Sequence, residues 1–464
     1  MHYLWVSIEK FGTVFLKVLG MVILARVLTP TDFGLFGMVY VIIALGQVLI
    51  DSGMGGALIK KDNANEQDYN TVFTFNLLVS LLIWLVLYFS SDMIASFYNE
   101  NSLTDIIPLL SSVLVIRSLT IVPVTKLTKS LNFKIQSKLV LFSYVSSFFV
   151  GYYFAVKEFG VYSLIIMSIC DVSIFLILTM YVTKYKVKIG FNYTAFKGLY
   201  GFGMKISIAS IIRTSYENIL NVFIGKIYGT ISLGFYYQAR KINDVFISTT
   251  TNVINKAVFP ILVKDLREGV TVKNKMRMLL NNICWLTYLF FVLLSINAEK
   301  IVFLIFGENW TESAWILSII VLSGFGMILE AATRCFLKSH GLASEILKLE
   351  LKKRSVGIVI ISLSAFGGIE IMLFAYVFST LISSFFNMYA VSRNTSYGIF
   401  EQVLDISKPL LFSILVYMFC ESTKYIFHSS ESMDYIYYLV LTLSILTYIF
   451  AFYKLRLVSN NNFL

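Results

Sequence analysis

"GFGMKISIASIIRTSYENILNVFIGK" (residues 201–226) has the length and apolar character of a membrane helix, but it carries Arg213 and Glu217 near its middle. A helix of about 20 apolar residues crosses a bilayer core roughly 30 Å thick. A charged side chain at the bilayer centre costs roughly 2.5–3.5 kcal/mol on insertion scales, so such charges usually face the protein interior or a water-filled cavity. The stretch therefore predicts a membrane protein with a polar interior.

Apolar runs of this length recur along the whole chain. Of its 464 residues 57% are hydrophobic and only 14% are charged, and the mean hydropathy is +0.77. We expect about fourteen membrane helices, with approximate cores at 4–25, 35–51, 71–89, 106–123, 139–156, 161–182, 204–223, 233–259, 278–296, 314–333, 355–366, 369–391, 409–425 and 435–453. Continuous apolar runs without a period-2 alternation favour helices over a membrane barrel. The sequence thus predicts an all-α polytopic membrane protein.

The net charge of +11 is distributed unevenly between alternate loops. Loops after even-numbered helices hold clusters such as Lys126, Lys129, Lys134 and Lys138, Lys184, Lys186 and Lys188, and Lys352, Lys353 and Arg354, whereas loops after odd-numbered helices hold Arg26, Lys157, Lys226, Lys300 and Lys424. By the positive-inside rule both termini are expected in the cytoplasm. The excess of lysine and arginine then indicates how the chain is oriented in the membrane and that it contacts anionic lipids. No nucleic-acid partner is expected. With three histidines and no metal-binding cysteine spacing, neither a metal nor a cofactor is predicted.

Short segments recur at an offset of about 200 residues, as expected for a transporter built from two similar bundles. "TDFGLFG" (31–37) matches "ISLGFYY" (231–237), with Gly34 and Gly234 in register, and "ALIKKD" (57–62) matches "PILVKD" (260–265). We expect two pseudo-symmetric six-helix lobes, residues 1–190 and 191–400, followed by two further helices and a cytoplasmic tail at 401–464.

Charged residues fall at helical spacing on equivalent helices of the two predicted lobes. Substrate-binding candidates are Lys10, Lys17, Arg117, Arg213, Arg240, Lys241 and Arg334, and ion-coupling candidates are Glu9, Glu217 and Asp244. Matched polar stripes are what a central water-filled cavity between two lobes requires. Because cations outnumber carboxylates, an anionic ligand is favoured. No catalytic residue is assigned.

Each of these charges also has a purely structural interpretation, and both interpretations stay open. Arg213 and Glu217, one turn apart, can neutralise each other and hold helices together. Near helix ends, long side chains can extend to the membrane interface, which applies to Arg334 with Glu330, to Glu9 with Lys10, and to Arg240, Lys241 and Asp244. The basic stretch 125–138 is expected to contact anionic headgroups, or to collect a lipid-linked substrate.

Several blocks in a fixed order carry a family resemblance from about Trp5 to the last helix. They are "LARVLTPTDFG" (24–34), "DSGMGGALIKKD" (51–62), "DYNTVFTFN" (68–76), "PVTKLTKSLNFK" (123–134), "IGKIYGTISLGFYYQAR" (224–240), "LIFGENW" (304–310) and "KLELKK" (348–353). With these blocks the chain resembles the polysaccharide transporter branch of the multidrug, oligosaccharidyl-lipid and polysaccharide exporter superfamily, the Wzx-type flippases of O-antigen and lipopolysaccharide biosynthesis. None of the blocks is a catalytic motif.

The resemblance implies a bacterial inner-membrane protein with fourteen helices in two lobes around a cationic cleft. Such a protein is expected to move undecaprenyl-pyrophosphate-linked oligosaccharide from the cytoplasmic to the outer leaflet, without being an enzyme. Charges on the first, seventh and eighth helices of relatives are held to contact the anionic head, and the matching residues here are Lys10, Lys17, Arg213 and Arg240. A coupling proton or sodium ion, and a polysaccharide polymerase with other assembly proteins as partners, are further expectations. Relatives usually have a short cytoplasmic segment before the first helix, whereas in this chain the first helix is expected to begin almost at Met1. The depth of Glu9 and Lys10 in the membrane is therefore left open.

Three other functions compete with this one. A multidrug antiporter of the same superfamily is expected to favour acidic cavity residues, against the cationic surplus here. A membrane polysaccharide polymerase or glycosyltransferase usually has a large external loop or acidic catalytic motifs, whereas the predicted outer loops are short. A scaffolding protein has no use for matched charged stripes.

Overall fold

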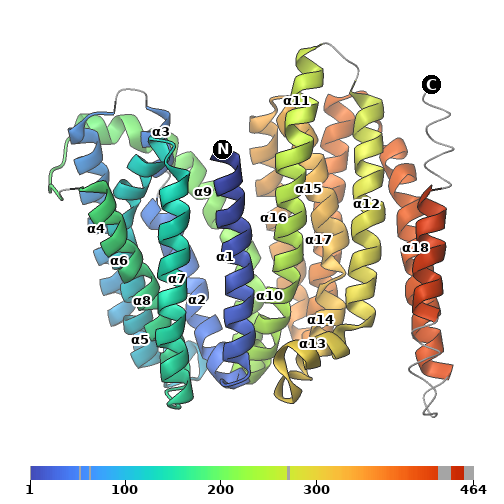
Figure 1. Cartoon of the computed structure of the whole chain (residues 1–464), viewed down its shortest axis with the longest axis horizontal. Helices are drawn as coiled ribbons and strands as arrows, with labels where there is room; N and C mark the ends of the chain where they lie inside the picture. Colours follow the sequence, from blue (N-terminus) through green and yellow to red (C-terminus); the bar gives the residue numbers. More distant parts are fainter. Residues whose placement is uncertain are drawn as a thin grey trace. The chain divides into compact units, whose positions relative to one another are not determined.

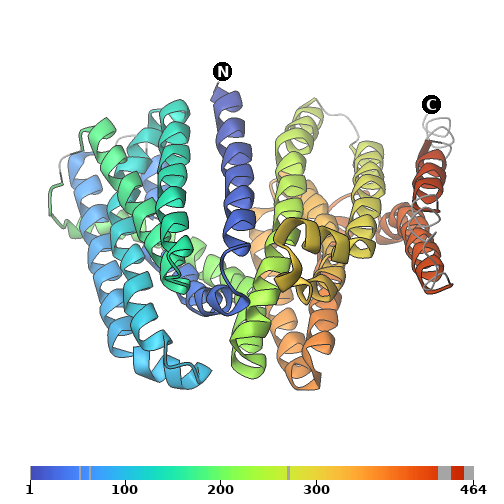
Figure 2. The ribbon, with the colours of Figure 1, turned by 60° about the horizontal axis from the view of Figure 1, so that its bottom comes forward.

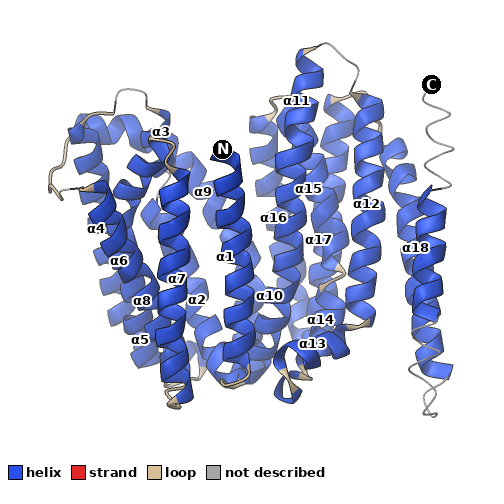
Figure 3. Ribbon diagram, in the orientation of Figure 1, coloured by secondary structure: helices blue, strands red, loops and turns tan. Residues whose placement is uncertain are grey.

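A computed structural model describes residues 2–51, 54–61, 64–185, 187–268, 272–426 and 440–453. Within these ranges the regular structure is helical throughout (Figure 3). Ten of the described helical segments are long and apolar enough to cross a membrane, and Gly12–Ala25 and Val440–Tyr453 are shorter apolar helices. The all-α polytopic class is confirmed, while the count of fourteen spans stays a prediction.

The chain divides into two compact units, and the first is made of Met1–Tyr237 with Ile305–Asn309. Its helices are α1 (His2–Ala25), α2 (Pro30–Asp51), α3 (Met54–Lys60), α4 (Glu66–Phe89), α5 (Ser91–Tyr98), α6 (Leu103–Lys129), α7 (Phe133–Val156), α8 (Val161–Thr183), α9 (Tyr193–Phe223) and the start of α10 (Gly229–Val253). Helix α8 packs against both α6 and α7, α4 against α6, α1 against α7, and α2 against α9 (Figures 1 and 2).

The second unit is made of Gln238–Leu304 with Trp310–Leu464. Besides the rest of α10 it contains α11 (Phe259–Arg267), α12 (Lys273–Ile296), α13 (Ala298–Phe306, whose last two residues belong to the first unit), α14 (Ser313–Ile320), α15 (Ser323–Ser339), α16 (Ala343–Ser364), α17 (Ile369–Asn394) and α18 (Ile399–Ile426). Helix α17 packs against α15 and α16, and α12 packs against α18 (Figure 1).

The start of α4 explains two of the blocks in the sequence. Asn65 caps α4 through its side chain, which accepts from the backbone N–H of Asp68, and the Asp68 carboxylate accepts in return from the backbone N–H of Asn65. This reciprocal capping box satisfies two backbone donors that the helix leaves unpaired. The same carboxylate lies 2.7 Å from Nζ of Lys61 and is nearly fully buried. The blocks "ALIKKD" and "DYNTVFTFN" therefore meet in one structural contact.

Lys126, in the basic stretch 125–138, is held by aromatic rings. Its Nζ lies 4.7 Å from the ring centroids of both Tyr69 and Tyr185. A tyrosine is a neutral phenol at physiological pH, and burial raises the pKa of Tyr185, in the loop after α8, further, to about 12. The faces of the two rings attract the lysine as cation–π partners. Lys126 thus holds α6 against α4 and this loop. Contact of the remaining stretch with headgroups stays a prediction.

The two glycines of the sequence repeat lie at one helix crossing within the first unit. A Cβ added to Gly34 would lie 1.9 Å from the carbonyl oxygen of Thr230, and a Cβ added to Gly234 would lie 1.9 Å from the carbonyl oxygen of Pro30. The pairs 30/230 and 34/234 share the same offset of about 200, so the starts of α2 and α10 contact each other reciprocally, as in a twofold interface. The repeat therefore has a direct packing consequence at this crossing.

Helix α16 begins earlier than the sequence indicates. We expected the eleventh membrane helix at 355–366, with Lys352, Lys353 and Arg354 in a cytoplasmic loop, but α16 begins at Ala343 and contains all three. Lys353 and Arg354 are only 1% and 5% exposed. The assignment of all three residues to a loop was wrong, because α16 extends through them, and the charges of Lys353 and Arg354 are paired inside the protein.

Helix α18 is joined to α12 by a polar cluster. The guanidinium of Arg277 donates to both carboxylate oxygens of Asp405, at 2.8 and 2.9 Å. The Tyr397 hydroxyl donates to the same carboxylate at 2.8 Å, and Asn281 donates to the Asp405 backbone carbonyl at 2.8 Å. Bidentate charge-assisted hydrogen bonds of this kind combine strength with a fixed orientation.

We expect Asp405→Asn to lower the free energy of unfolding by about 1.5–3 kcal/mol, the range for hydrogen bonds to charged groups. Asparagine keeps the size of the side chain but loses the charge that Arg277 and Tyr397 require. Thermal unfolding of the purified protein measures the effect, with Glu268→Gln, in an exposed ion pair with Lys264, as the matched control. Equal unfolding midpoints for the two variants would show that the cluster does not hold α18.

Candidate functional site

The first unit brings two of the predicted cations to one carboxylate. Lys17 lies in α1 and Arg117 lies midway along α6, and both side chains are exposed. Each interacts electrostatically with Asp171 of α8. Nζ of Lys17 also lies 6.0 Å from the ring centroid of Tyr144. Exposed cations within apolar helices require either water or an anion beside them, and Asp171 supplies an anion to both Lys17 and Arg117.

Asp171 was missed in the sequence, although a signal was present. It is the single charged residue of α8, and an ionisable residue inside a membrane segment suggests a functional role by default. The Ser143 hydroxyl of α7 donates to its Oδ1 at 3.0 Å, which fixes the carboxylate. Arg117 also interacts with Asp51, at the end of α2. Arg117 therefore lies within electrostatic range of two carboxylates, which partly offset its charge.

Arg213 and Glu217 form an ion pair on α9, but a loose one. Nε of Arg213 lies 3.8 Å from Oε1 of Glu217, and the two side chains are 51% and 43% exposed. An exposed pair at this distance contributes little to stability, typically 1 kcal/mol or less. The contact thus leaves much of the guanidinium accessible, as a ligand-binding role requires.

Arg240 and Asp244 repeat this arrangement on α10 with a different exposure. Nε of Arg240 lies 3.4 Å from Oδ2 of Asp244, with side chains 16% and 50% exposed. Lys241 is half-buried beside them. The carboxylate is therefore the more accessible member of this pair, whereas the cation is the more accessible member of the Arg213 pair.

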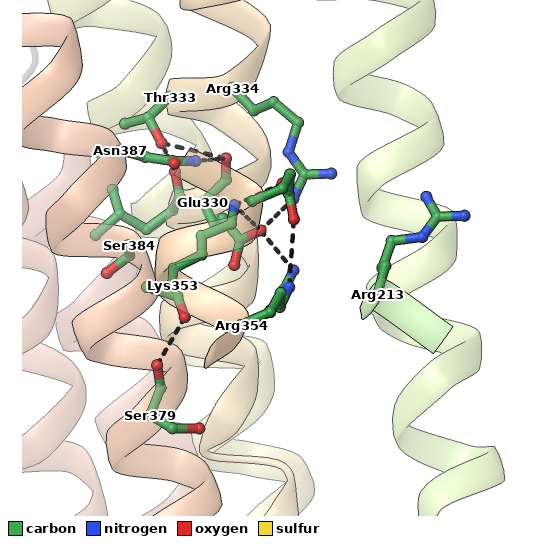
Figure 4. Close-up of polar contacts among 12 residues, drawn as sticks. Arg213, Glu330, Thr333, Arg334, Lys353, Arg354, Ser379, Ser384 and Asn387 are labelled. Carbon is green, nitrogen blue, oxygen red and sulfur yellow. Dashed lines mark hydrogen bonds and ion pairs between the residues drawn. The ribbon is translucent and has the colours of Figure 1, made fainter. Parts of the chain in front are cut away.

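Arg334 belongs to a buried ion network in the second unit (Figure 4). Oε1 of Glu330 accepts from Arg334, from Nζ of Lys353 at 2.8 Å, and from Nη2 of Arg354 at 2.9 Å. Glu350 of α16 adds a second carboxylate, with Oε1 2.6 Å from Nζ of Lys353 and Oε2 3.3 Å from Nε of Arg354. The five side chains carry three positive and two negative charges. They join α15 to α16.

Asn387 extends the network to α17. Its Nδ2 donates to the backbone carbonyl of Glu330 at 3.2 Å, and the Thr333 hydroxyl donates to the same carbonyl at 3.2 Å (Figure 4). Only Glu330 and Arg334 stood out in the sequence. The i, i+3 and i, i+4 spacings of Glu350, Lys353 and Arg354 were the signal that could have found the rest.

Two predicted residues cannot be placed. The side chains of Glu9 and Lys10 lie outside the residues whose side chains the structure describes. Among the others the structure places Lys17 and Arg117 within electrostatic range of the same carboxylate, Asp171, and pairs Arg213 with Glu217 and Arg240 with Asp244. Convergence of all these charges on one cavity stays a prediction.

Comparison with known proteins identifies the family. The sequence model of the family described as "Polysaccharide biosynthesis protein" matches residues 23–315, more than half of the chain. The chain belongs to this family. The matched range includes Arg117, Arg213 and Arg240, whereas the network around Glu330 lies beyond it.

Similar proteins of this family carry related names. The teichuronic acid biosynthesis protein TuaB of Bacillus subtilis is 24% identical over 330 residues, covering 70% of this chain and 68% of TuaB. The lipopolysaccharide biosynthesis protein WzxC of Escherichia coli is 21% identical over 331 residues, covering 69% of this chain and 65% of WzxC. These matches confirm the resemblance to the polysaccharide transporter branch.

The fold of this polysaccharide biosynthesis family member is also seen in a solved flippase. The lipid II flippase MurJ in an inward closed conformation superposes with a TM-score of 0.72, covering 97% of this chain and 99% of that one, at 14% identity. At this identity the likeness establishes the fold. The chain is thus a multi-span membrane protein with a MurJ-like fold.

Proposed function

We propose that this protein is a flippase that moves an undecaprenyl-pyrophosphate-linked oligosaccharide from the cytoplasmic to the outer leaflet of the bacterial inner membrane. Membership of the polysaccharide biosynthesis family supports the substrate class. One observation supports an anionic headgroup as the ligand. Arg213 lies in the apolar helix α9, and half of its side chain is exposed despite its pairing with Glu217. A pyrophosphate is the kind of ligand that offsets the cost of a guanidinium in such a helix.

The transport step is proposed to be alternating access between two lobes, residues 1–190 and 191–400. The sugar-pyrophosphate head would occupy the cationic interior while the prenyl tail stays in lipid. Lys10, Lys17, Arg117, Arg213, Arg240, Lys241 and Arg334 are the proposed substrate contacts. Such a cycle requires that the ligand bind the two states with different affinity.

Coupling, orientation and partners complete the proposal. A proton or a sodium ion drives the cycle, with Glu9, Glu217 or Asp244 as its carrier. Both termini lie in the cytoplasm, membrane lipids surround the helices, and a polysaccharide polymerase with other assembly proteins receives the product. The protein carries out no covalent chemistry. A multidrug antiporter is disfavoured because cations outnumber carboxylates among the candidate residues of the two lobes, whereas a site for cationic drugs favours acidic residues.

We expect Arg213→Ala to reduce export about 10- to 100-fold, the effect of losing one hydrogen bond to a charged group, without reducing the amount of protein in the membrane. Surface polysaccharide and the lipid-linked intermediate facing the cytoplasm are measured in cells that express only the variant. Lys264→Ala is the matched control, because Lys264 also pairs at i, i+4, with Nζ 3.7 Å from Oε1 of Glu268, and is 74% exposed. Normal surface polysaccharide in the Arg213→Ala cells would remove Arg213 from the proposed site.

A further inference from the structure

Arg334 can leave the Glu330 network without leaving a carboxylate unpaired. Oε1 of Glu330 already accepts from Lys353 at 2.8 Å and from Arg354 at 2.9 Å. Oε1 of Glu350, the second carboxylate near Arg334, lies 2.6 Å from Lys353 but 3.4 Å from Arg334. If Arg334 moves away, each carboxylate keeps a cation at close range.

Arg334 is also the most accessible member of the network. Its side chain is 35% exposed, whereas those of Lys353, Glu330, Arg354 and Glu350 are 1%, 3%, 6% and 15% exposed. The shared pairing permits the release of Arg334, and its exposed position distinguishes it from the other cations of the network. The four buried charges form a fixed base, and Arg334 lies at its open edge.

The guanidinium of Arg334 has unused donor capacity. A guanidinium offers five N–H donors in a planar fork, and both contacts of Arg334 with carboxylates use Nη2. Among the described residues its Nε has no hydrogen-bond partner, although the atom is buried. A buried donor without a partner is unfavourable, and a planar fork matches two oxygens of a phosphate or carboxylate.

We propose that Arg334 is an exchangeable arm that binds a phosphate group of the ligand. Without ligand, Glu330 and Glu350 hold the arm; with ligand, its fork turns to the phosphate while Lys353 and Arg354 keep Glu330 paired. The inference rests on the proposed function, since a pyrophosphate-linked substrate brings the phosphate. A phospholipid headgroup carries the same group, and the experiment separates the two sources. Glu330, Glu350, Lys353 and Arg354 are positioning residues.

The test uses the full-length protein in phosphatidylcholine nanodiscs with inorganic pyrophosphate as the probe. We expect Arg334→Gln to weaken pyrophosphate binding about tenfold or more, and Arg334→Lys to weaken it less, because lysine keeps the charge without the fork. Lys264→Gln, which removes an exposed charge elsewhere on the second unit, is expected to change the Kd less than about twofold. The unfolding midpoint of each variant without ligand is measured beside the Kd.

A second arm of the experiment identifies the source of the phosphate. In nanodiscs that also contain phosphatidylglycerol, the number of retained phosphatidylglycerol molecules is counted by mass spectrometry for the natural protein and for Arg334→Gln. If Arg334→Gln loses pyrophosphate binding, Arg334 binds the phosphate of the substrate. If it loses only the retained phosphatidylglycerol, Arg334 binds a lipid headgroup. Unchanged binding of both, or unfolding of Arg334→Gln without ligand, would overturn the inference.

Measurements of polysaccharide export distinguish a failure of this inference from a failure of the proposed function. If Arg334→Gln loses pyrophosphate binding but depletion of the natural protein leaves export intact, the arm stands and the flippase function fails. If depletion stops export while Arg334→Gln binds pyrophosphate and exports normally, the function stands and the arm is excluded.

Discussion

Replacement of Glu330 by alanine is expected to lower the free energy of unfolding by about 3–5 kcal/mol, the cost of removing one partner from a buried ion pair. The substitution leaves Arg334, Lys353 and Arg354 close together with Glu350 as the remaining carboxylate of the network. Lys353 is 1% exposed, so water cannot screen its repulsion from the two arginines. We expect α15 and α16 to separate at this point.

Unfolding can be followed at a natural reporter on the same helix. Cys335 of α15 is 1% exposed, so a thiol-reactive dye labels it only when the helix opens. The exposed Glu268 provides the control, because Glu268→Ala removes the same charge from a surface pair and should change stability by about 1 kcal/mol or less. A midpoint for Glu330→Ala equal to that of the control would mean that the network contributes little.

A second variant tests the physical cause. The double replacement Glu330→Met and Lys353→Met removes one charge of each sign and fills the space with apolar groups. A hydrophobic replacement of a buried ion pair is often neutral or stabilising, so we expect the double variant to unfold at a higher temperature than Glu330→Ala. Failure to recover would show that shape, and not charge, sets the effect.

The membrane helices could be predicted because hydropathy alone determines them. Long apolar runs such as 161–182 correspond closely to α8, since every backbone polar group must be bonded within the segment when lipid surrounds it. The charged candidates on the first, fourth and seventh helices were also recognisable. A charge in an apolar run is costly and therefore conspicuous.

The α16 members of the ion network could not be predicted from hydropathy, because their stretch of sequence resembles a loop. "KLELKK" (348–353) is too polar for a hydropathy window, yet α16 runs through it. Lysine, leucine and glutamate are all good helix formers, and the charges are paired with α15 after folding. Only tertiary contacts, which a sequence does not display, turn Lys353 from a loop cation into a buried one.

For Asp171 the residue itself was visible in the sequence, but its partners were not. The sequence displayed it plainly, as one carboxylate in an apolar helix, but gave no indication of its partners. Lys17 and Arg117 come from α1 and α6, far away in the chain. Which charges meet depends on how α1, α6 and α8 pack, so single residues could be selected while their pairing could not.

The crossing of α2 and α10 leaves no room for a side chain at Gly34. We expect Gly34→Ala to lower the free energy of unfolding by about 3 kcal/mol, the upper end of the usual cost of overpacking. The new methyl group would lie 1.9 Å from the carbonyl oxygen of Thr230, and a backbone atom cannot rotate away as a side-chain end can. The two helices must therefore move apart.

Reciprocity makes the second glycine informative. Gly234→Ala places its methyl group 1.9 Å from the carbonyl oxygen of Pro30, so we expect a similar loss for each single variant. Because the first alanine already separates the helices, the double variant should lose less than the sum of the two, as coupled neighbours do. Gly198→Ala is the control: among the described residues, no atom apart from the neighbouring backbone of its own helix lies within 4 Å of the added methyl group, and alanine is the better helix former in α9. Thermal unfolding of the four variants measures whether the two substitutions are coupled. If the losses caused by Gly34→Ala and Gly234→Ala are strictly additive in the double variant, the two glycines do not share one crossing.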